Sequence, residues 1–313
     1  MLARTAESLF WLARYMERAD YVARLLQVAG QMSAVRVDSD RRSEWESAII
    51  AAGCREAYLA RHASIDEASV IDFLAFDRDN PSSIANCIET ARRNARSVRT
   101  ALTTSMWEAV QGSWQELAAF RDGHLDADRL NEFLEWARVR ADLFHGACSN
   151  SMLRRDGFFF LRTGQFLERA DNVARLLDVK YHVRLPQVSD IGGVIDYYQW
   201  LAILKVVGAR RAYRVLFKGR VEPAQVAELL ITRAVFPRSL AYCYEQISEN
   251  LESIQAQDPA RAAEAKRCAH SLHADLRYAS VERIIESGLH EFLTGVIERT
   301  DALGEHIARG HLF

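Results

Sequence analysis

The stretch SLFWLARYMERADYVARLLQV, residues 8–28, decides the fold, because a close copy of it, GFFFLRTGQFLERADNVARLLDV, returns at residues 157–179. At an offset of 151, the two copies share Glu17-Arg18-Ala19-Asp20 with Glu168-Arg169-Ala170-Asp171, and Val22-Ala23-Arg24-Leu25-Leu26 with Val173-Ala174-Arg175-Leu176-Leu177. A weaker third version, Glu298-Arg299-Thr300-Asp301, lies near the C-terminus. Repetition of this kind predicts a fold built from repeated helical units.

The charges of the repeated stretch fall on one side of a helix that is otherwise apolar. Glu17, Asp20 and Arg24 are spaced i, i+3 and i+7, which places them in one row, and Glu168, Asp171 and Arg175 repeat the row in the second copy. A helix that is apolar nearly all round is expected to be buried, and a buried ion needs a partner. We therefore favour a structural ion-pair network over a ligand or catalytic pocket, which stays as the alternative.

Two further blocks repeat at nearly the same offset. Trp45, Gly53, Arg55, Ala57 and Tyr58 return at an offset of 155 as Trp200, Gly208, Arg210, Ala212 and Tyr213. Pro81, Ser83, Ala85, Cys87, Glu89, Asn94 and Ser97 return at an offset of 156 as Pro237, Ser239, Ala241, Cys243, Glu245, Asn250 and Ser253. We therefore predict one all-α domain over residues 1–313, a helical bundle of two tandem-duplicated units, about 1–155 and 156–313, without a flexible linker.

The apolar spacing also predicts individual helices, among them residues 6–32, 104–120, 126–148, 209–217 and 280–308. Pro81 is expected in the first turn of one helix with Ser or Asn as its cap, and Gly53 and Gly208 at helix crossings or breaks. We expect Pro186 to end the second repeated helix, residues 191–193 to form a joint, and Gly288 to be a break in the last helix. The second unit shows no clear sequence counterpart of the helix that contains Trp107.

One feature is present in the first unit alone. Arg92, Arg96 and Arg99 form a basic stripe at i, i+4 and i+7 with Arg93 beside it, whereas the second copy has Ser248, Glu252 and Gln255 at the aligned positions and Glu249 opposite Arg93. The stripe is a candidate site for phosphate or an acidic partner. The favoured alternative is that it pairs with acidic rows elsewhere in the bundle.

Composition excludes several classes. Hydrophobic residues make up 49% of the chain, with 5 Pro and 15 Gly, as in an all-α globular protein, and no apolar run reaches the length of a membrane span. The net charge of -2 provides no global field to attract nucleic acid or an anionic membrane. The five cysteines are widely spaced and resemble free thiols, and no signal peptide is apparent, so we expect a cytoplasmic protein.

No motif for a metal or a cofactor stands out. The best metal-like spacings are Asp142 with His145 and His270 with His273, but histidines three residues apart are common on ordinary helices. The chain has no glycine-rich phosphate loop, nucleophile elbow or dinucleotide fingerprint. We therefore predict no metal and no cofactor.

The repeated ERAD helix, the DRDNPSSI and RRNARSVR segments, the WLAILKVVGARRAYR block and FPRSLAYC together resemble the bacterial alpha-E family across essentially the whole chain. The matching positions are Glu17, Arg18, Asp20, Pro81, Ser83, Arg92, Arg96, Arg99, Trp200, Tyr213, Pro237, Arg238 and Ser239. The resemblance implies association with circularly permuted ATP-grasp ligases and transglutaminase-like proteins in peptide or amide-bond chemistry. It implies no catalytic residue.

Two functions follow as expectations. The first is a non-catalytic helical accessory or scaffold protein that docks the ATP-grasp ligase, which agrees with the absence of cofactor motifs. The alternative is an enzyme of the same pathway, in which the carboxylates of the two rows act as acid and base and the arginine stripe clamps an anion. Catalysis is thus uncertain, with the non-catalytic role favoured, and the oligomeric state is unknown.

Overall fold

The structure is a computed structural model that describes residues 1–35, 42–121, 126–182 and 194–313. Over these residues all regular secondary structure is helical, which confirms the all-α class. The helices are α1 (Ala3–Val35), α2 (Arg42–Ala51), α3 (Arg55–Leu59), α4 (Glu67–Ala75), α5 (Ile84–Ser97), η1 (Arg99–Ala101), α6 (Thr104–Arg121), α7 (Ala127–Ser151), α8 (Asp156–His182), α9 (Val194–Val206), α10 (Arg210–Phe217), α11 (Pro223–Ile231), α12 (Leu240–Ser253), α13 (Pro259–Arg277), α14 (Val281–Ser287) and α15 (Leu289–His311).

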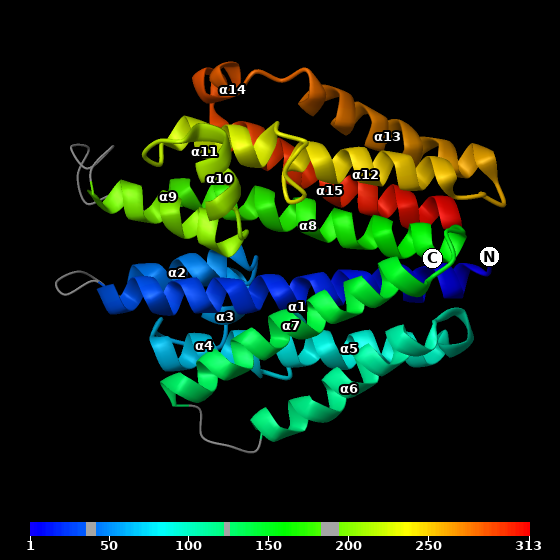
Figure 1. Ribbon diagram of the computed structural model, residues 1–313, viewed down its shortest axis with the longest axis horizontal. Coiled ribbons are helices and arrows are strands. Elements are labelled where there is room, and N and C mark those ends of the chain that lie inside the picture. The colour runs from blue at the N-terminus through cyan, green and yellow to red at the C-terminus, as the bar shows by residue number, and fades with distance from the viewer. Residues whose placement is uncertain (36–41, 122–125, 183–193) are drawn as a thin grey trace.

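The two helices that carry the repeated sequence, α1 and α8, lie side by side through the middle of the molecule (Figure 1). Helices α5, α6 and α7 lie on the α1 side, and α12, α13 and α15 lie on the α8 side. Residues of α1 enter all three buried hydrophobic clusters, with Phe10 in the first, Val22 in the second and Leu12 in the third. The apolar surface predicted all round this helix is thus buried against neighbours on every side.

Pairs of helices on the two sides make matching contacts. Helix α5 packs on α1 and α6, as α12 packs on α8 and α13, while α7 packs on α1 and α6 as α15 packs on α8 and α13. Helix α2 also crosses onto α8, and α9 crosses onto α1. The tandem duplication itself stays a prediction. Helix α13 packs on α12 and α15 as α6 packs on α5 and α7. The comparison of the two sequence copies did not reveal this correspondence.

Capping residues account for several boundaries. The Ser83 hydroxyl accepts the Asn86 amide at the start of α5, and Ser239 accepts that of Tyr242 at the start of α12. Pro81 therefore precedes the helix rather than entering its first turn. Gly53 and Gly208 follow α2 and α9 with φ of 67° and 68°, so each marks a helix break at which glycine avoids strain.

Other boundaries differ from the predictions by a few residues. Gly288, with φ 108°, separates α14 from α15 as expected. Helix α1 extends beyond the predicted residues 6–32 at both ends, and α7 extends to Ser151. The predicted stop at Pro186 and joint at 191–193 lie outside the described residues. Among the described helices, none combines the length and hydropathy needed to cross a membrane.

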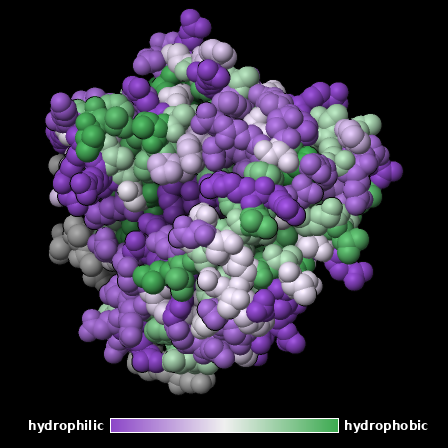
Figure 2. Space-filling model, turned by 45° about the vertical axis from the view of Figure 1, so that its right-hand side comes forward, coloured by the Kyte–Doolittle hydropathy of each residue, from purple (hydrophilic) through white to green (hydrophobic). Residues whose placement is uncertain are grey.

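The surface carries few large apolar areas on the face seen in Figure 2, where hydrophobic residues form separate groups among hydrophilic ones. The apolar content is instead concentrated in the three buried clusters. Protein recognition on this face therefore has to rely largely on polar groups.

The closest approach of α1 and α8 gives the first testable prediction. A Cβ atom on Gly164 would overlap the carbonyl oxygen of Phe10 and lie 3.0 Å from its carbonyl carbon. We expect Gly164→Ala to lower the free energy of unfolding by about 1 to 3 kcal/mol, as overpacking does, measured by urea denaturation.

The matched control is Gly146→Ala on α7, where an added Cβ meets nothing within 4 Å. This change should be neutral or stabilise by up to about 1 kcal/mol through helix propensity. Equal effects of the two substitutions would contradict the close packing of α1 on α8.

Candidate functional site

The parallel packing of α1 and α8 brings the two Glu-Arg pairs together in a reciprocal arrangement. Arg169 donates from Nε and Nη2 to the two oxygens of Glu17, both at 2.7 Å. Arg18 donates in the same way to Glu168, at 2.5 and 3.0 Å. Each carboxylate therefore receives a bidentate guanidinium from the other helix, the strongest and most directional form of ion pair.

Additional donors complete the shell around each glutamate. The Glu17 carboxylate also lies 3.0 Å from Nη1 of Arg238 and 3.3 Å from Nε2 of His145, and it accepts a hydrogen bond from Gln165 at 3.5 Å. Glu168 accepts a further bond of 2.8 Å from Nε of Arg14. Both glutamates are 1% exposed, so their oxygens face protein donors rather than solvent.

The aspartates of the two rows bind the arginine one turn later on their own helix. Arg24 donates from Nε to Asp20 at 2.8 and 2.9 Å, and Arg175 does so to Asp171 at 3.0 and 2.8 Å. Arg238 joins the first pair through a bond of 2.8 Å to Asp20. Six arginines and four carboxylates thus form three neighbouring ion-paired groups, which we call together the ER network: Glu17, Asp20, Arg24, Arg169 and Arg238 in the first, Glu168, Arg14 and Arg18 in the second, and Asp171 and Arg175 in the third.

Two glycine turns close the network from opposite sides. A Cβ on Gly208 would lie 3.5 Å from Nη1 of Arg24, and one on Gly53 would lie 3.5 Å from Nη1 of Arg175. Each turn thus faces the arginine of the other unit. The positive φ at both glycines lets the backbone pass close to the guanidinium groups.

The charges of the network keep its glutamates ionised. Burial alone would raise the pKa of Glu17, but the adjacent Arg169 and Arg238 outweigh burial and hold the pKa well below its usual range. For Glu168, burial acts in the same way and Arg18 and Arg14 outweigh it, so the pKa is about 2. A general base working at neutral pH needs a pKa near 7, so neither glutamate is suited to this role.

Asp171 differs from the two glutamates. Burial raises its pKa, and the attraction of Arg175 opposes that effect only in part. Its oxygens are occupied by Arg175, however, and Asp301 approaches the same arginine at 3.8 Å. Asp171 is therefore a member of the network rather than a group free to exchange a proton with a substrate.

The third Glu-Arg version does not join the centre of the network. Glu298 is exposed, and Arg299 binds Asp275 at 2.7 Å on the surface between α13 and α15. Asp301 touches the network only through its 3.8 Å approach to Arg175, and its side chain is 63% exposed. The third version therefore repeats the motif, but its side chains lie at the surface and not between two packed helices.

The arginine stripe, Arg92, Arg93, Arg96 and Arg99, lies on and just after α5 beside α6. The Arg92 guanidinium stacks 3.6 Å from the ring centre of Trp114 and donates to Gln111 at 2.9 Å, and Arg99 lies 5.1 Å from the ring centre of Trp107. Within the described residues none of the four arginines pairs with a carboxylate. The sequence-based alternative, that the stripe neutralises acidic rows of the bundle, predicts ion pairs that the stripe does not form in this part of the chain.

The metal-like spacings are used for internal contacts. His145 points to Glu17 while Asp142 is exposed, and His270 bonds Ser248 through Nδ1 and Glu252 through Nε2, both at 2.8 Å. No group of three or more potential ligands suited to a metal occurs in the part of the chain that the structure describes.

The cysteines are free, and four of them are buried. Burial raises the pKa of Cys87 and of Cys243 to about 12 and that of Cys148 to about 11. A thiol with such a pKa is protonated at neutral pH, so these side chains are not nucleophiles in the folded protein.

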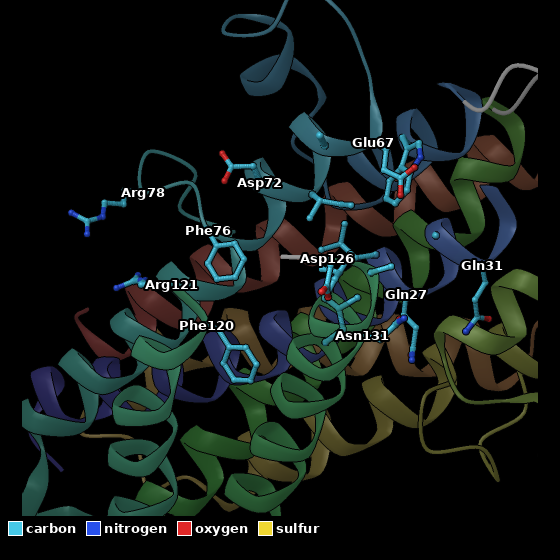
Figure 3. Close-up of a pocket in the computed structure, with 18 residues that line it drawn as sticks. Gln27, Gln31, Glu67, Asp72, Phe76, Arg78, Phe120, Arg121, Asp126 and Asn131 are labelled. Carbon is cyan, nitrogen blue, oxygen red and sulfur yellow. The ribbon is translucent and has the colours of Figure 1, made fainter. Parts of the chain in front are cut away.

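A groove that the sequence did not indicate lies at one end of the first unit (Figure 3). Its volume is about 1070 Å³, and its walls come from α1, α2, α4 and the adjoining ends of α6 and α7. Phe76 and Phe120 lie in the middle, Arg78 and Arg121 at one end, and Gln31 at the other. These residues share no motif and converge only through the fold, so no sequence pattern could have grouped them.

The ER network predicts large effects of single substitutions. Glu17→Ala and Glu168→Ala should each lower the free energy of unfolding by about 3 to 5 kcal/mol, because each strands buried guanidinium groups. Chemical denaturation followed by circular dichroism measures the loss. Glu298→Ala, in the exposed third version, serves as the control and should stay within about 0.5 kcal/mol of the wild type. Melts of Glu17→Ala and Glu168→Ala that match the wild type would refute the buried network.

Acid sensitivity follows from the lowered pKa of Glu168. Since its pKa is about 2 in the folded chain and ordinarily 4.5, the unfolded chain takes up the proton first as the pH falls. The contribution to stability is complete above about pH 4.5 and disappears toward pH 2, a loss of about 3 kcal/mol that Glu17 increases in the same direction. Urea unfolding between pH 6 and pH 2.5 should show this decline, and Glu168→Gln should show a shallower one. An equally steep decline in the variant would contradict the assignment.

Comparison with known proteins places these features in a family. Curated relatives from Mycobacterium bovis and Mycobacterium tuberculosis, described as uncharacterized proteins, are 25% identical to this chain in an alignment of 319 residues, which covers 94% of this chain and 35% of each relative. The chain therefore spans about a third of the length of these relatives. No solved structure matches the chain significantly. The model of the family described as a predicted alpha-helical domain with a conserved ER motif matches residues 1–312, and the chain belongs to this alpha-E family.

Proposed function

We propose that this chain is a non-catalytic helical accessory protein that docks an ATP-grasp ligase, together with transglutaminase-like proteins, in peptide or amide-bond chemistry. The enzyme class of the partner comes from the family resemblance. The observation that carries the docking role is the arginine stripe, four guanidinium groups without a carboxylate partner in the described residues, two of which rest on indole rings.

The aligned positions of the second unit show how different the stripe is. Ser248 and Glu252 both bind His270 of α13, and Glu252 also accepts a bond of 3.0 Å from Lys266. The second unit therefore pairs these side chains with residues of its own helix α13, whereas the first unit leaves the arginines of the stripe without a carboxylate partner in the described residues. Unpaired charge backed by aromatic rings is suited to an acidic protein surface, which it attracts over a distance and orients on contact.

The lengths of the relatives support a role beside another protein. In the mycobacterial proteins the region similar to this chain is about a third of a longer polypeptide. A domain joined to other domains in relatives is commonly one that works in contact with them. The ER network is consistent with this role, since its glutamates are saturated with donors and stay ionised, which makes the alternative of an acid-base enzyme less suitable.

Co-purification from the native cell tests the proposal. An affinity-tagged wild type should recover a protein with an ATP-grasp domain, identified by mass spectrometry, and recovery should fall as salt rises. The variant Arg92→Ser, Arg96→Glu, Arg99→Gln, which copies the second unit, should recover at least about tenfold less, because an interfacial charge change of this size costs more than 1.4 kcal/mol of binding.

A charge-matched control separates docking from net charge. Arg261→Ser, Arg267→Glu, Arg309→Gln makes the same charge change at exposed positions on α13 and α15 and should leave recovery unchanged. Since Arg92 also stacks on Trp114, the triple variant should lose up to about 2 kcal/mol of stability. The single change Arg96→Glu avoids this loss and should still weaken recovery. Unchanged recovery by both stripe variants would refute the docking surface.

A further inference from the structure

The groove in the first unit has a filled counterpart in the second. Residues 65–84, which include α4, align with residues 221–240, which include α11, at the same offset of 156. The structure repeats the local contacts: Tyr58 donates to the carbonyl of Ser64, and Tyr213 donates to that of Arg220, in both cases at 3.0 Å. Helices α4 and α11 therefore hold equivalent places beside their bundles.

On the second side a short helix covers α11. Helix α14, with 7 residues, packs on α11 and directs Val281 and Ile284 into the large hydrophobic cluster, where they are 4% and 7% exposed. Ala227 of α11 is buried there as well, at 1% exposed. Figure 1 shows α14 above α11, where the chain passes from the end of α13 to the start of α15.

The connection between the two corresponding helices is much shorter on the first side. The connection from α13 to α15 consists of residues 278–288 and includes α14. The connection from α6 to α7 consists of residues 122–126 only. The position of α4 equivalent to Ala227 is Ile71, which lines the groove and is half-buried. The groove of about 1070 Å³ thus lies where the second side has its covering helix.

We infer that this groove receives a short amphipathic helix from the partner protein, in the position that α14 takes on the other side. The inference rests on the proposed docking function and adds to it the kind of segment that docks. Two apolar side chains spaced i and i+3, like Val281 and Ile284, match an apolar floor that includes Ile71, Phe76 and Leu130. Helix-in-groove recognition commonly uses anchors at this spacing.

The charges at the two ends of the groove define the occupant further. Arg78 forms no ion pair within the described residues, and Arg121, which binds Glu89 at 2.7 Å, has an Nη2 atom without a partner. Both lie at the same end (Figure 3). Glu67 lies toward the opposite end and is likewise unpaired within the described residues. Asp72 and Asp126 also line the groove, so the occupant is an amphipathic helix that directs an acidic residue at Arg78 and Arg121 and a basic residue at the carboxylates.

A peptide with the sequence of residues 278–288 provides the probe, because it contains the two apolar anchors and the acidic residues Glu282 and Glu286. A lactam between Arg283→Lys and Ser287→Asp, four residues apart, holds it in a helix, and a fluorophore at its N-terminus reports binding to the full chain by anisotropy. We expect saturable binding that weakens as salt rises, and at least about tenfold weaker binding of the Ile284→Asp peptide.

Variants of the chain locate the site. Ile71→Glu, which places a charge on the floor, and Ala68→Trp, which fills the groove from an exposed position, should each weaken binding at least about tenfold, and Arg78→Glu should reduce its salt dependence. Val215→Glu, at a 65% exposed position on α10, should bind like the wild type. Circular dichroism verifies that each variant is folded, and Ala68→Trp provides the test if Ile71→Glu is not.

The outcomes distinguish the two proposals. No binding at millimolar peptide, or binding that Ile71→Glu and Ala68→Trp leave unchanged, overturns the groove, even if the arginine stripe variants still lose the ligase. Groove-dependent peptide binding without recovery of any ATP-grasp protein upholds the preference of the groove for amphipathic helices and refutes the proposed partner.

Discussion

The reciprocal pairing of Glu17 with Arg169 and of Glu168 with Arg18 is the constraint on which the rest of the structure depends. It fixes the register of α1 against α8, because a slip of one turn would separate Glu17 from Arg169 and leave buried charges without their partners, at a cost of several kcal/mol. Every other described α-helix packs, directly or through one neighbour, on this central pair. The ion pairs thus select one register of α1 against α8, whereas hydrophobic burial alone would also allow other registers.

Much of this arrangement could be predicted from the sequence, because it depends on residues that are repeated and regularly spaced. The row of Glu17, Asp20 and Arg24 in an apolar helix indicates a buried ionic network before any coordinates are considered. The two partners of Glu17 from outside these helices, Arg238 and His145, could not be predicted. Arg238, for example, aligns with Ser82 and precedes a different helix. Long-range contacts of this kind depend on tertiary packing rather than on periodicity.

The surface features show the same limit more clearly. The spacing of the arginine stripe is local and can be recognised in the sequence, but whether its charges are paired depends on which side chains α6 brings beside it. The groove depends on a length difference, the few residues between α6 and α7 against the longer segment that contains α14. That difference is visible in the sequence only after α13 is recognised as the counterpart of α6, which its own residues do not reveal.

The asymmetry between the two sides separates structural from binding features. On the second side, Ser248 and Glu252 bind His270 of α13, and α14 covers α11. The first side leaves both the arginine stripe and the groove open, and Arg121 at the end of the groove binds Glu89, which lies one turn before Arg93 on α5. A segment seated in the groove with its acidic end at Arg121 would therefore leave it next to the arginine stripe. One acidic partner could then occupy both features at once, and the linked contacts would bind more tightly than either alone.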